Sequence, residues 1–152
     1  MRRIVILTAF VAALVAAAPA AATALRPSCG PGCATLYANG TGTLGVTGSG
    51  DEWGGISSGT IWVRDRTGAG HAKNWVHGAA LNWSWIGDGG WKVTSKKAMT
   101  FSATTKFWLK LKGPGIYVSG VLDGSGTIAG TGKYTLNGHA HSWPQTAKAL
   151  SF

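Results

Sequence analysis

The stretch Leu44-Gly-Val-Thr-Gly48, with its continuation to Ile61-Trp-Val-Arg-Asp65, occurs twice in this sequence. A shift of 72 positions aligns the two copies, residues 44–65 and 116–137, without a gap. The identical positions are Val46 and Val118, Gly48 and Gly120, Asp51 and Asp123, Gly54 and Gly126, and Ile56 and Ile128. Each copy has a short apolar run, a polar glycine-rich turn such as Gly48–Gly55 and a second run, which predicts an internally duplicated β-hairpin.

The sequence outside the repeats also alternates between apolar and polar residues. From Leu81 to Thr94, apolar residues recur at every second position on both sides of the turn Asp88-Gly-Gly90, which predicts a further hairpin. A last strand is expected within Thr146–Phe152. No segment after the first 24 residues shows a helical period with caps, and the glycine content disfavours helix. We therefore predict an all-β fold, an antiparallel β-sandwich or closed β-barrel of about 8–10 short strands, with a short β-solenoid as the alternative.

The N-terminus has the features of a secretory signal peptide. Arg2 and Arg3 form a basic start, Ile4–Ala18 is apolar, and Ala22-Thr-Ala24 fits a cleavage site, so residues 1–24 are expected to be removed. The apolar run is short and rich in alanine, and no later stretch approaches the length that crosses a bilayer. The mature chain is therefore expected to be secreted, extracellular or associated with the cell wall, without a transmembrane segment.

The mature chain has the length of one domain. We expect a single β-domain at residues 41–152, preceded by an N-terminal segment at residues 25–40. That segment contains the two cysteines of the chain, Cys29 and Cys33, separated by Gly-Pro-Gly. A close pair of cysteines in an exported protein predicts a disulfide, and its short loop would make it a local staple.

The chain is strongly basic, with 14 Lys and Arg against 5 Asp and Glu and a formal net charge of +9 at pH 7. Most of this excess remains when Arg2 and Arg3 leave with the signal peptide. A basic exported protein is attracted to polyanions such as teichoic acids, acidic polysaccharides, anionic lipids or nucleic acid. High net charge also keeps a small protein soluble, so charge alone names no partner.

The run Lys106-Phe-Trp-Leu-Lys-Leu-Lys112 is the strongest candidate binding site. In a strand, its apolar alternate residues would face the core, and the outer face would carry Lys106, Trp108, Lys110 and Lys112. An exposed indole among ammonium groups can stack on a sugar or a base while the lysines meet anionic groups. Lysines on a strand surface also prevent edge-to-edge aggregation, which needs no ligand. A second and weaker stripe of the same kind contains Trp62, Arg64 and Arg66.

The chain contains 8 tryptophans, several of which must be at least partly exposed in a domain of this size. Trp83, Trp85 and Trp91 alternate with polar residues in the hairpin around Asp88. Because tryptophan supplies a large apolar area in a domain that is poor in Leu and Phe, we expect these three to pack in the core.

Catalytic residues are hard to place in this sequence. The carboxylates lie in or beside glycine-rich turns, where Asp also hydrogen-bonds to its own backbone. Asp51 and Asp123 are equivalent in the repeats and would form a glycosidase-like pair if the two copies met, although two equivalent turn residues are the simpler interpretation. No nucleophile-elbow, zinc-protease or phosphate-loop motif is present. We therefore predict no catalytic residues and favour a protein that is not an enzyme.

His139-Ala-His141 would place two imidazoles on one face of a strand, a spacing that metal sites on β-scaffolds use. His71 or His77 would be needed as a third ligand. No acidic residue or cysteine lies nearby in the sequence, so we predict no metal site and no cofactor.

Three segments carry a resemblance to a known type of protein: Gly40–Gly48 with the pattern G-x-G-x-L-x-V-x-G, the run Gly59–Asp65, and Gly132–Gly138. They resemble small exported, glycine-rich β-proteins of actinobacteria that carry no established function. The resemblance covers most of the mature chain and consists of turn and strand features. It implies an exported β-protein and no catalytic residues to carry over.

Together these patterns predict an exported β-domain that binds an anionic or carbohydrate polymer of the cell envelope through the face of Trp108, without catalysis and without a specific nucleic-acid partner. A small secreted hydrolase is one alternative, which requires ionisable groups that converge in a cleft. A membrane-active protein is the other alternative, in which basic amphipathic strands would insert into a bilayer.

Overall fold

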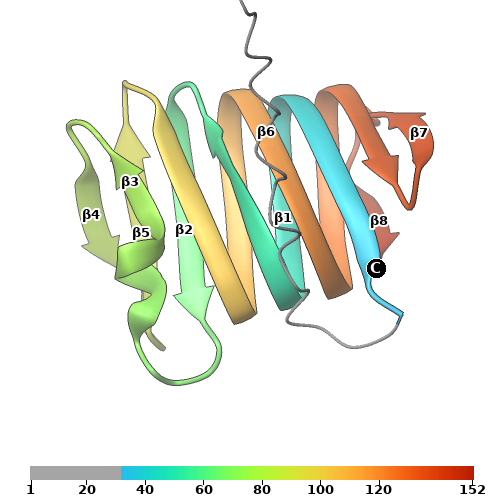
Figure 1. Ribbon diagram of the computed structural model, residues 1–152. Helices are drawn as coiled ribbons and strands as arrows, with labels where there is room; N and C mark the ends of the chain where they lie inside the picture. The colour runs from blue at the N-terminus through green and yellow to red at the C-terminus, as the bar shows by residue number, and fades with distance from the viewer. Residues whose placement is uncertain (1–31) are drawn as a thin grey trace, which may run out of the picture.

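The computed structural model describes residues 32–152, which form one antiparallel sheet and confirm the predicted all-β class (Figure 1). The elements are β1 (Ala34–Ile56), β2 (Gly59–Asp65), the short 3-10 helix η1 (His71–Trp75), β3 (Val76–Gly78), β4 (Asn82–Trp85), β5 (Gly90–Ser95), β6 (Met99–Leu136), β7 (His139–Ser142) and β8 (Lys148–Ser151). Within this range, no helix is long and apolar enough to cross a bilayer.

The strands β1 and β6 are much longer than the short strands predicted, with 23 and 38 residues. The glycine-rich runs Gly48–Gly55 and Gly113-Pro-Gly115 lie inside them. The prediction of a hairpin turn at Gly48–Gly55 is therefore wrong. The chain stays extended there and pairs with β6 on both sides, because glycine bends the strand at these points without reversing it.

β1 and β6 pass together from one layer of the sheet to another and back, as Figure 1 shows. Ala38 of β1 pairs with both Val118 and Tyr134 of β6, and Val118 also pairs with Gly54 of β1. Each strand therefore returns to the same layer after it has passed through the other one. We call the layer with the order β7, 132–136, 34–40, 116–122, 50–56, 99–105 and β3 the front layer. The back layer has the order β8, 124–130, 42–48, 106–113, β2, β5 and β4.

The sheet is not closed into a barrel. β7 and β3 form the edges of the front layer, and β8 and β4 form those of the back layer. Of the predicted architectures, the sandwich-like one is therefore observed, with the unusual feature that continuous strands join its two layers.

The strands change layer at glycines, except between residues 99–105 and 106–113 of β6, where Thr105 has a positive φ of 67°. Gly42 and Gly130 lie opposite each other at one such corner, with φ angles of 146° and 134°. A β-carbon on Gly42 would lie closer than 3.0 Å to the carbonyl oxygen of Ala129, and one on Gly130 would lie equally close to that of Thr41. Only glycine therefore allows the two backbones to approach and bend at this corner.

The two sequence repeats pair with each other in the centre of the molecule. Residues 44–56 lie beside residues 116–128, and Gly50 lies opposite Leu122, which is its own counterpart at the offset of 72 positions. An antiparallel pair in which a residue faces its counterpart has a local two-fold axis through that pair. This axis exchanges the repeats and also exchanges the front and back layers.

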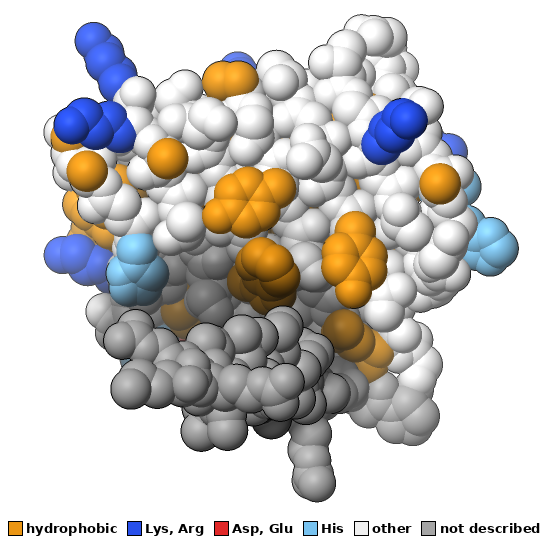
Figure 2. All heavy atoms as spheres, turned by 45° about the horizontal axis from the view of Figure 1, so that its top comes forward, with side chains coloured by type: hydrophobic (Ala, Val, Ile, Leu, Met, Phe, Trp, Pro, Cys, Tyr) orange, Lys and Arg blue, Asp and Glu red, His pale blue; other side chains and the backbone are white. Residues whose placement is uncertain are grey.

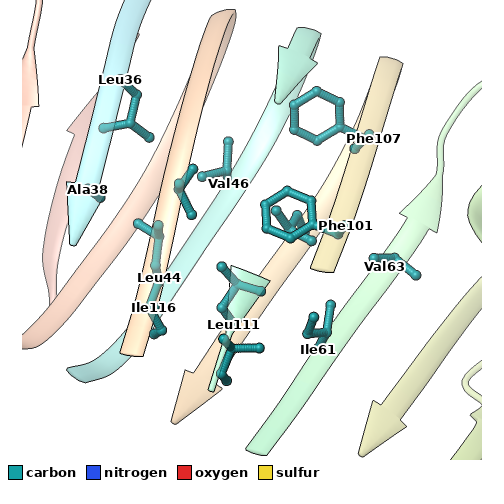
Figure 3. Packing of buried hydrophobic residues seen from close by; sticks show 14 of the residues in the cluster. Leu36, Ala38, Leu44, Val46, Ile61, Val63, Phe101, Phe107, Leu111 and Ile116 are labelled. Atoms are coloured by element: carbon teal, nitrogen blue, oxygen red, sulfur yellow. The ribbon is translucent and has the colours of Figure 1, made fainter. Parts of the chain in front are cut away.

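Alternate side chains fill the space between the two layers. Phe107, Leu109 and Leu111 are at most 1% exposed, which confirms the predicted inner side of this run. Figure 3 shows Phe107 and Leu111 from the back layer and Leu36 and Ile116 from the front layer, which all belong to one buried cluster. Burial of such side chains is the main source of stability in a sheet-on-sheet core.

Tryptophans and η1 close the end of the sandwich beside β4 and β5. Trp83 and Trp91 pack against the core with an edge-to-face contact of 5.9 Å, and Lys73 of η1 lies 5.8 Å and 5.0 Å from their ring centroids. Trp85 is 57% exposed, so its predicted place in the core is wrong. It lies at the end of the edge strand β4, opposite Trp91, where no further strand covers it.

Two predictions fall on residues outside the described range. The signal peptide, residues 1–24, and Cys29 lie there, whereas Cys33 directly precedes β1. Export and the Cys29–Cys33 disulfide therefore remain predictions. Residues 34–40, which the sequence assigned to the N-terminal segment, form the first front-layer part of β1.

Gly42→Ala is expected to lower the free energy of unfolding by roughly 2–4 kcal/mol, because the new β-carbon would meet the Ala129 carbonyl in an unfavourable backbone conformation. Gly68→Ala is the matched control, since Gly68 also has a positive φ of 84° but has nothing within 4 Å of an added β-carbon. Urea denaturation of both variants measures the difference. Equal losses in the two variants would contradict a special role for the corner.

Candidate functional site

The back layer presents the predicted Lys106–Lys112 run to solvent. Lys106 and Lys112 are exposed, and Trp108 and Lys110 are half-buried on the same outer side of β6. The separation into an inner apolar side and an outer basic side is therefore as the sequence predicts. What this surface binds remains a prediction.

The second stripe predicted from the sequence lies on the neighbouring strand, β2. Arg64 is opposite Trp108, and Trp62 is opposite Lys110. The guanidinium carbon of Arg64 lies 5.6 Å from the Trp108 ring centroid, and Lys110 Nζ lies 5.4 Å from that of Trp62. Two rings and two cations thus alternate at the corners of a square, in which each ring is stacked with a cation from the other strand.

Further basic residues surround this square. Lys92 on β5 lies directly opposite Trp62, and the backbone N–H of Arg66 donates to the Lys106 carbonyl oxygen at 2.9 Å. Lys92 is not among the predicted site residues, although its alternation with Trp91 and Val93 in the sequence is the signal that places it on the outer side. We call the surface formed by Trp62, Arg64, Arg66, Lys92, Lys106, Trp108, Lys110 and Lys112 the basic–aromatic face.

The side chain of Arg64 has three neighbours on this face. Its guanidinium stacks on Trp108, and its Nη1 lies 3.7 Å from Asp88 Oδ2 at the rim. A β-carbon on Gly90 would come within 3.1 Å of Arg64 Nε, so glycine leaves room for the side chain. The Asp88 side chain is 86% exposed, so this ion pair is weak and leaves the face positive.

Two shallow hollows flank Trp108. One, of about 210 Å³, is lined by Arg64, Arg66 and Trp108. The other, of about 290 Å³, extends over Gly45, which lies opposite Lys110 and contributes no side chain. Its remaining lining includes the hydroxyls of Thr47, Ser125 and Thr127. A ligand at Trp108 would therefore meet cations on one side and hydroxyl groups on the other.

The loop that carries Arg66 is fixed by Asp65. The Asp65 carboxylate accepts hydrogen bonds from the backbone N–H of Thr67 at 2.8 Å and of His71 at 2.9 Å, and from the Thr67 hydroxyl. Burial by itself raises the pKa of Asp65, but these hydrogen bonds outweigh burial and hold the pKa below its usual value. Asp65 is therefore ionised and holds the loop in place.

The other groups considered for catalysis or metal binding lie in different surroundings. Asp51 is opposite Val121 and Asp123 is opposite Ser49, so the two carboxylates are diagonal neighbours beside the local two-fold axis. His141 stacks on Tyr134 with 4.9 Å between ring centroids. In the described part of the chain, no group of three or more His, Cys, Asp or Glu is placed to hold a metal ion.

Comparison of the chain with protein-family models, with curated proteins and with solved structures finds no match. The resemblance to small exported proteins of actinobacteria therefore remains an expectation from the sequence.

Glu52 carries a second buried carboxyl group, in surroundings unlike those of Asp65. It is 1% exposed, it points into the core from β1, and neither of its oxygens has a hydrogen-bond partner within residues 32–152. Gly120, directly opposite, leaves room for its side chain. Burial raises the pKa of Glu52 from 4.5 to about 8, so the folded protein holds this group protonated at neutral pH.

The raised pKa predicts a specific pH dependence of stability. Between pH 4.5 and about 8 the folded state retains a proton that the unfolded state has lost, so stability falls as pH rises through this window. Glu52→Met is expected to remove this fall and to raise the free energy of unfolding at pH 8 by on the order of 3 kcal/mol.

Urea denaturation at several pH values tests this prediction. Glu52→Gln is the control for charge, because it cannot ionise and should also flatten the profile while it retains a buried polar group. A wild-type stability that is constant between pH 4.5 and 8 would contradict the assignment.

Proposed function

We propose that the protein binds an anionic polymer through the basic–aromatic face and does not catalyse a reaction. The observation that carries the proposal is the square of Trp62, Arg64, Trp108 and Lys110, in which rings hold cations in fixed positions on two adjacent strands. Cations that are fixed before binding lose less conformational freedom when they meet a ligand.

The arrangement of the charges favours a polymer over a small anion. Lys106, Lys110 and Lys112 follow one another along a strand, so their charges form a row across an open surface. The hollows beside Trp108 are shallow and lie on either side of that row. A linear array suits a ligand whose charges recur along a chain, because many weak contacts then act together.

The two indoles and the neighbouring hydroxyls favour a polymer that also carries sugars or polyols. Trp62 and Trp108 offer apolar ring surface, and Thr47, Ser125 and Thr127 offer hydrogen-bonding groups. With export predicted from the N-terminus, wall teichoic acids and acidic polysaccharides are the polymers that combine these properties. The hydrolase and membrane-active alternatives gain no specific observation from the described residues.

The variant Lys106→Ala/Lys110→Ala/Lys112→Ala is expected to bind teichoic acid at least roughly tenfold more weakly at low salt, because three contacts to anionic groups are lost. The dependence of its affinity on salt concentration is expected to become shallower as well, since fewer counterions are released on binding. Isothermal titration calorimetry at two or more salt concentrations measures both effects, with polygalacturonate and DNA as comparison polyanions.

The matched control is Lys96→Ala/Lys97→Ala/Lys148→Ala, which removes the same charge from exposed positions outside the basic–aromatic face. This control is expected to retain most of the affinity. Equal weakening by both triple variants would show attraction by net charge without a defined site, and absence of wild-type binding to every polyanion would reject the proposal.

A further inference from the structure

The outer side of the front layer carries a second surface of different chemistry. Among the described residues, the large hydrophobic side chains that are exposed are Tyr37 (56%), Trp53 (47%), Trp85 (57%) and Tyr117 (40%). All of these except Trp85 line one hollow of about 370 Å³. Figure 2 shows hydrophobic side chains in the middle of the molecular surface in this view, with the visible basic side chains towards its margins. Exposed rings that gather in one hollow indicate a binding site more strongly than scattered ones.

The pairing of the strands sets the spacing of the rings. Ser119 lies directly opposite Tyr37 on one side and directly opposite Trp53 on the other. Adjacent strands are about 4.8 Å apart, so the two aromatic side chains rise from backbones roughly 10 Å apart, with the small Ser119 between them as a floor. A gap of this width accommodates one saturated six-membered ring with an aromatic surface on each side at about 4 Å.

Tyr117 lies beside Trp53 and lines the same side of the hollow. The two rings meet edge to face, with centroids 6.5 Å apart and an interplanar angle of 68°. Gly55 is opposite Tyr117, and a β-carbon there would come within 3.0 Å of the tyrosine ring. Glycine thus gives Tyr117 the space to lie over the neighbouring strand. Asn39 flanks Tyr117 on the opposite strand and completes the other side of the hollow.

The polar groups of the hollow are almost all uncharged. Asn39, Ser119 and Thr135 provide amide and hydroxyl groups, Lys133 provides one ammonium group, and no carboxylate is part of the lining. Rings that accept the C–H face of a ligand, beside groups that both donate and accept hydrogen bonds, are complementary to a sugar. The near-absence of charge is complementary to a neutral one.

The local two-fold axis relates this hollow to the one beside Trp108. At the offset of 72 positions, Thr47 corresponds to Ser119, Ser125 to Trp53 and Gly45 to Tyr117. In the register, Trp108 lies opposite Thr47 as Tyr37 lies opposite Ser119. The two hollows therefore lie at equivalent positions of the repeats. The front-layer hollow has aromatic side chains, whereas the back-layer hollow has small residues with hydroxyl groups beside lysines.

We propose that the hollow between Tyr37 and Trp53 binds a pyranose ring of a neutral glycan, as a site separate from the basic–aromatic face. A proline-rich peptide also uses aromatic grooves, but its backbone has few N–H donors for the hydroxyl and amide oxygens of Ser119, Thr135 and Asn39. Two sites of different specificity on opposite layers would let one molecule join a neutral glycan to an anionic polymer.

Nitrogen–proton correlation spectra of the purified protein test the site, because each tryptophan gives its own indole signal and Trp53→Phe assigns that of Trp53. The probes are the hexasaccharides of β-linked glucose, α-linked glucose, β-linked N-acetylglucosamine and β-linked mannose, with a proline-rich peptide as the competing class of ligand. We expect saturable shifts of the Trp53 indole signal with at least one of the hexasaccharides. Trp53→Ala and Tyr37→Ala should weaken that binding roughly threefold to tenfold each.

Trp85→Ala is the matched control, because it removes an exposed ring outside the hollow and should leave glycan affinity unchanged. The triple variant at Lys106, Lys110 and Lys112 should also bind the glycan normally, which separates this test from that of the basic–aromatic face. Unchanged backbone signals elsewhere show that each variant is folded. No shift with any of the glycans, an equal effect of Trp85→Ala, or saturable shifts only with a proline-rich peptide would overturn the proposal.

Discussion

The structure depends on two antiparallel strands that bend together from one layer to the next without losing their backbone hydrogen bonds. Where β1 and β6 pass from one layer to the other, the backbone of one strand lies against that of the other, as at Gly42 and Gly130. A side chain at either position would separate the strands and leave buried N–H and C=O groups without partners, which is unfavourable. The high glycine content is thus a requirement of the winding, and the core forms because the winding brings two layers face to face.

The same winding decides which surfaces are available for binding. Each passage of a strand sends alternate side chains into the core and the others to one of two outer surfaces. On the back layer, the outer side chains of β2 and β6 produce the square of Trp62, Arg64, Trp108 and Lys110. On the front layer, residues of β1 and β6 produce a nearly uncharged aromatic hollow. The two surfaces lie on opposite sides of one core, so they can bind different ligands without contact between the ligands.

The duplication explains why the two surfaces have related geometry and different chemistry. The positions that are identical between the repeats are small, apolar or acidic residues that build the central ribbon, such as Val46 and Val118. The outer positions differ, so that Trp53 of one repeat corresponds to Ser125 of the other. The identical positions of the repeats build the same backbone arrangement twice, and the different residues at the outer positions give the two surfaces their different chemistry. Glu52 is another departure from the symmetry, since its counterpart Gly124 has no side chain to bury.

The sequence by itself determined the all-β class, the inner and outer sides of Lys106–Lys112, and the β4–β5 hairpin, because a period of two fixes the side of each residue wherever the strand lies. It did not determine that Gly48–Gly55 continues a strand, since glycine permits both a turn and a bend and only pairing with β6 decides between them. It placed Trp85 wrongly, because burial depends on the next strand and β4 is an edge. The joining of the Trp62 stripe to the Trp108 stripe, and the placement of Tyr37 and Trp53 on either side of Ser119, were decided by tertiary structure alone. These arrangements depend on register between segments far apart in the chain, and local sequence patterns contain no information on that register.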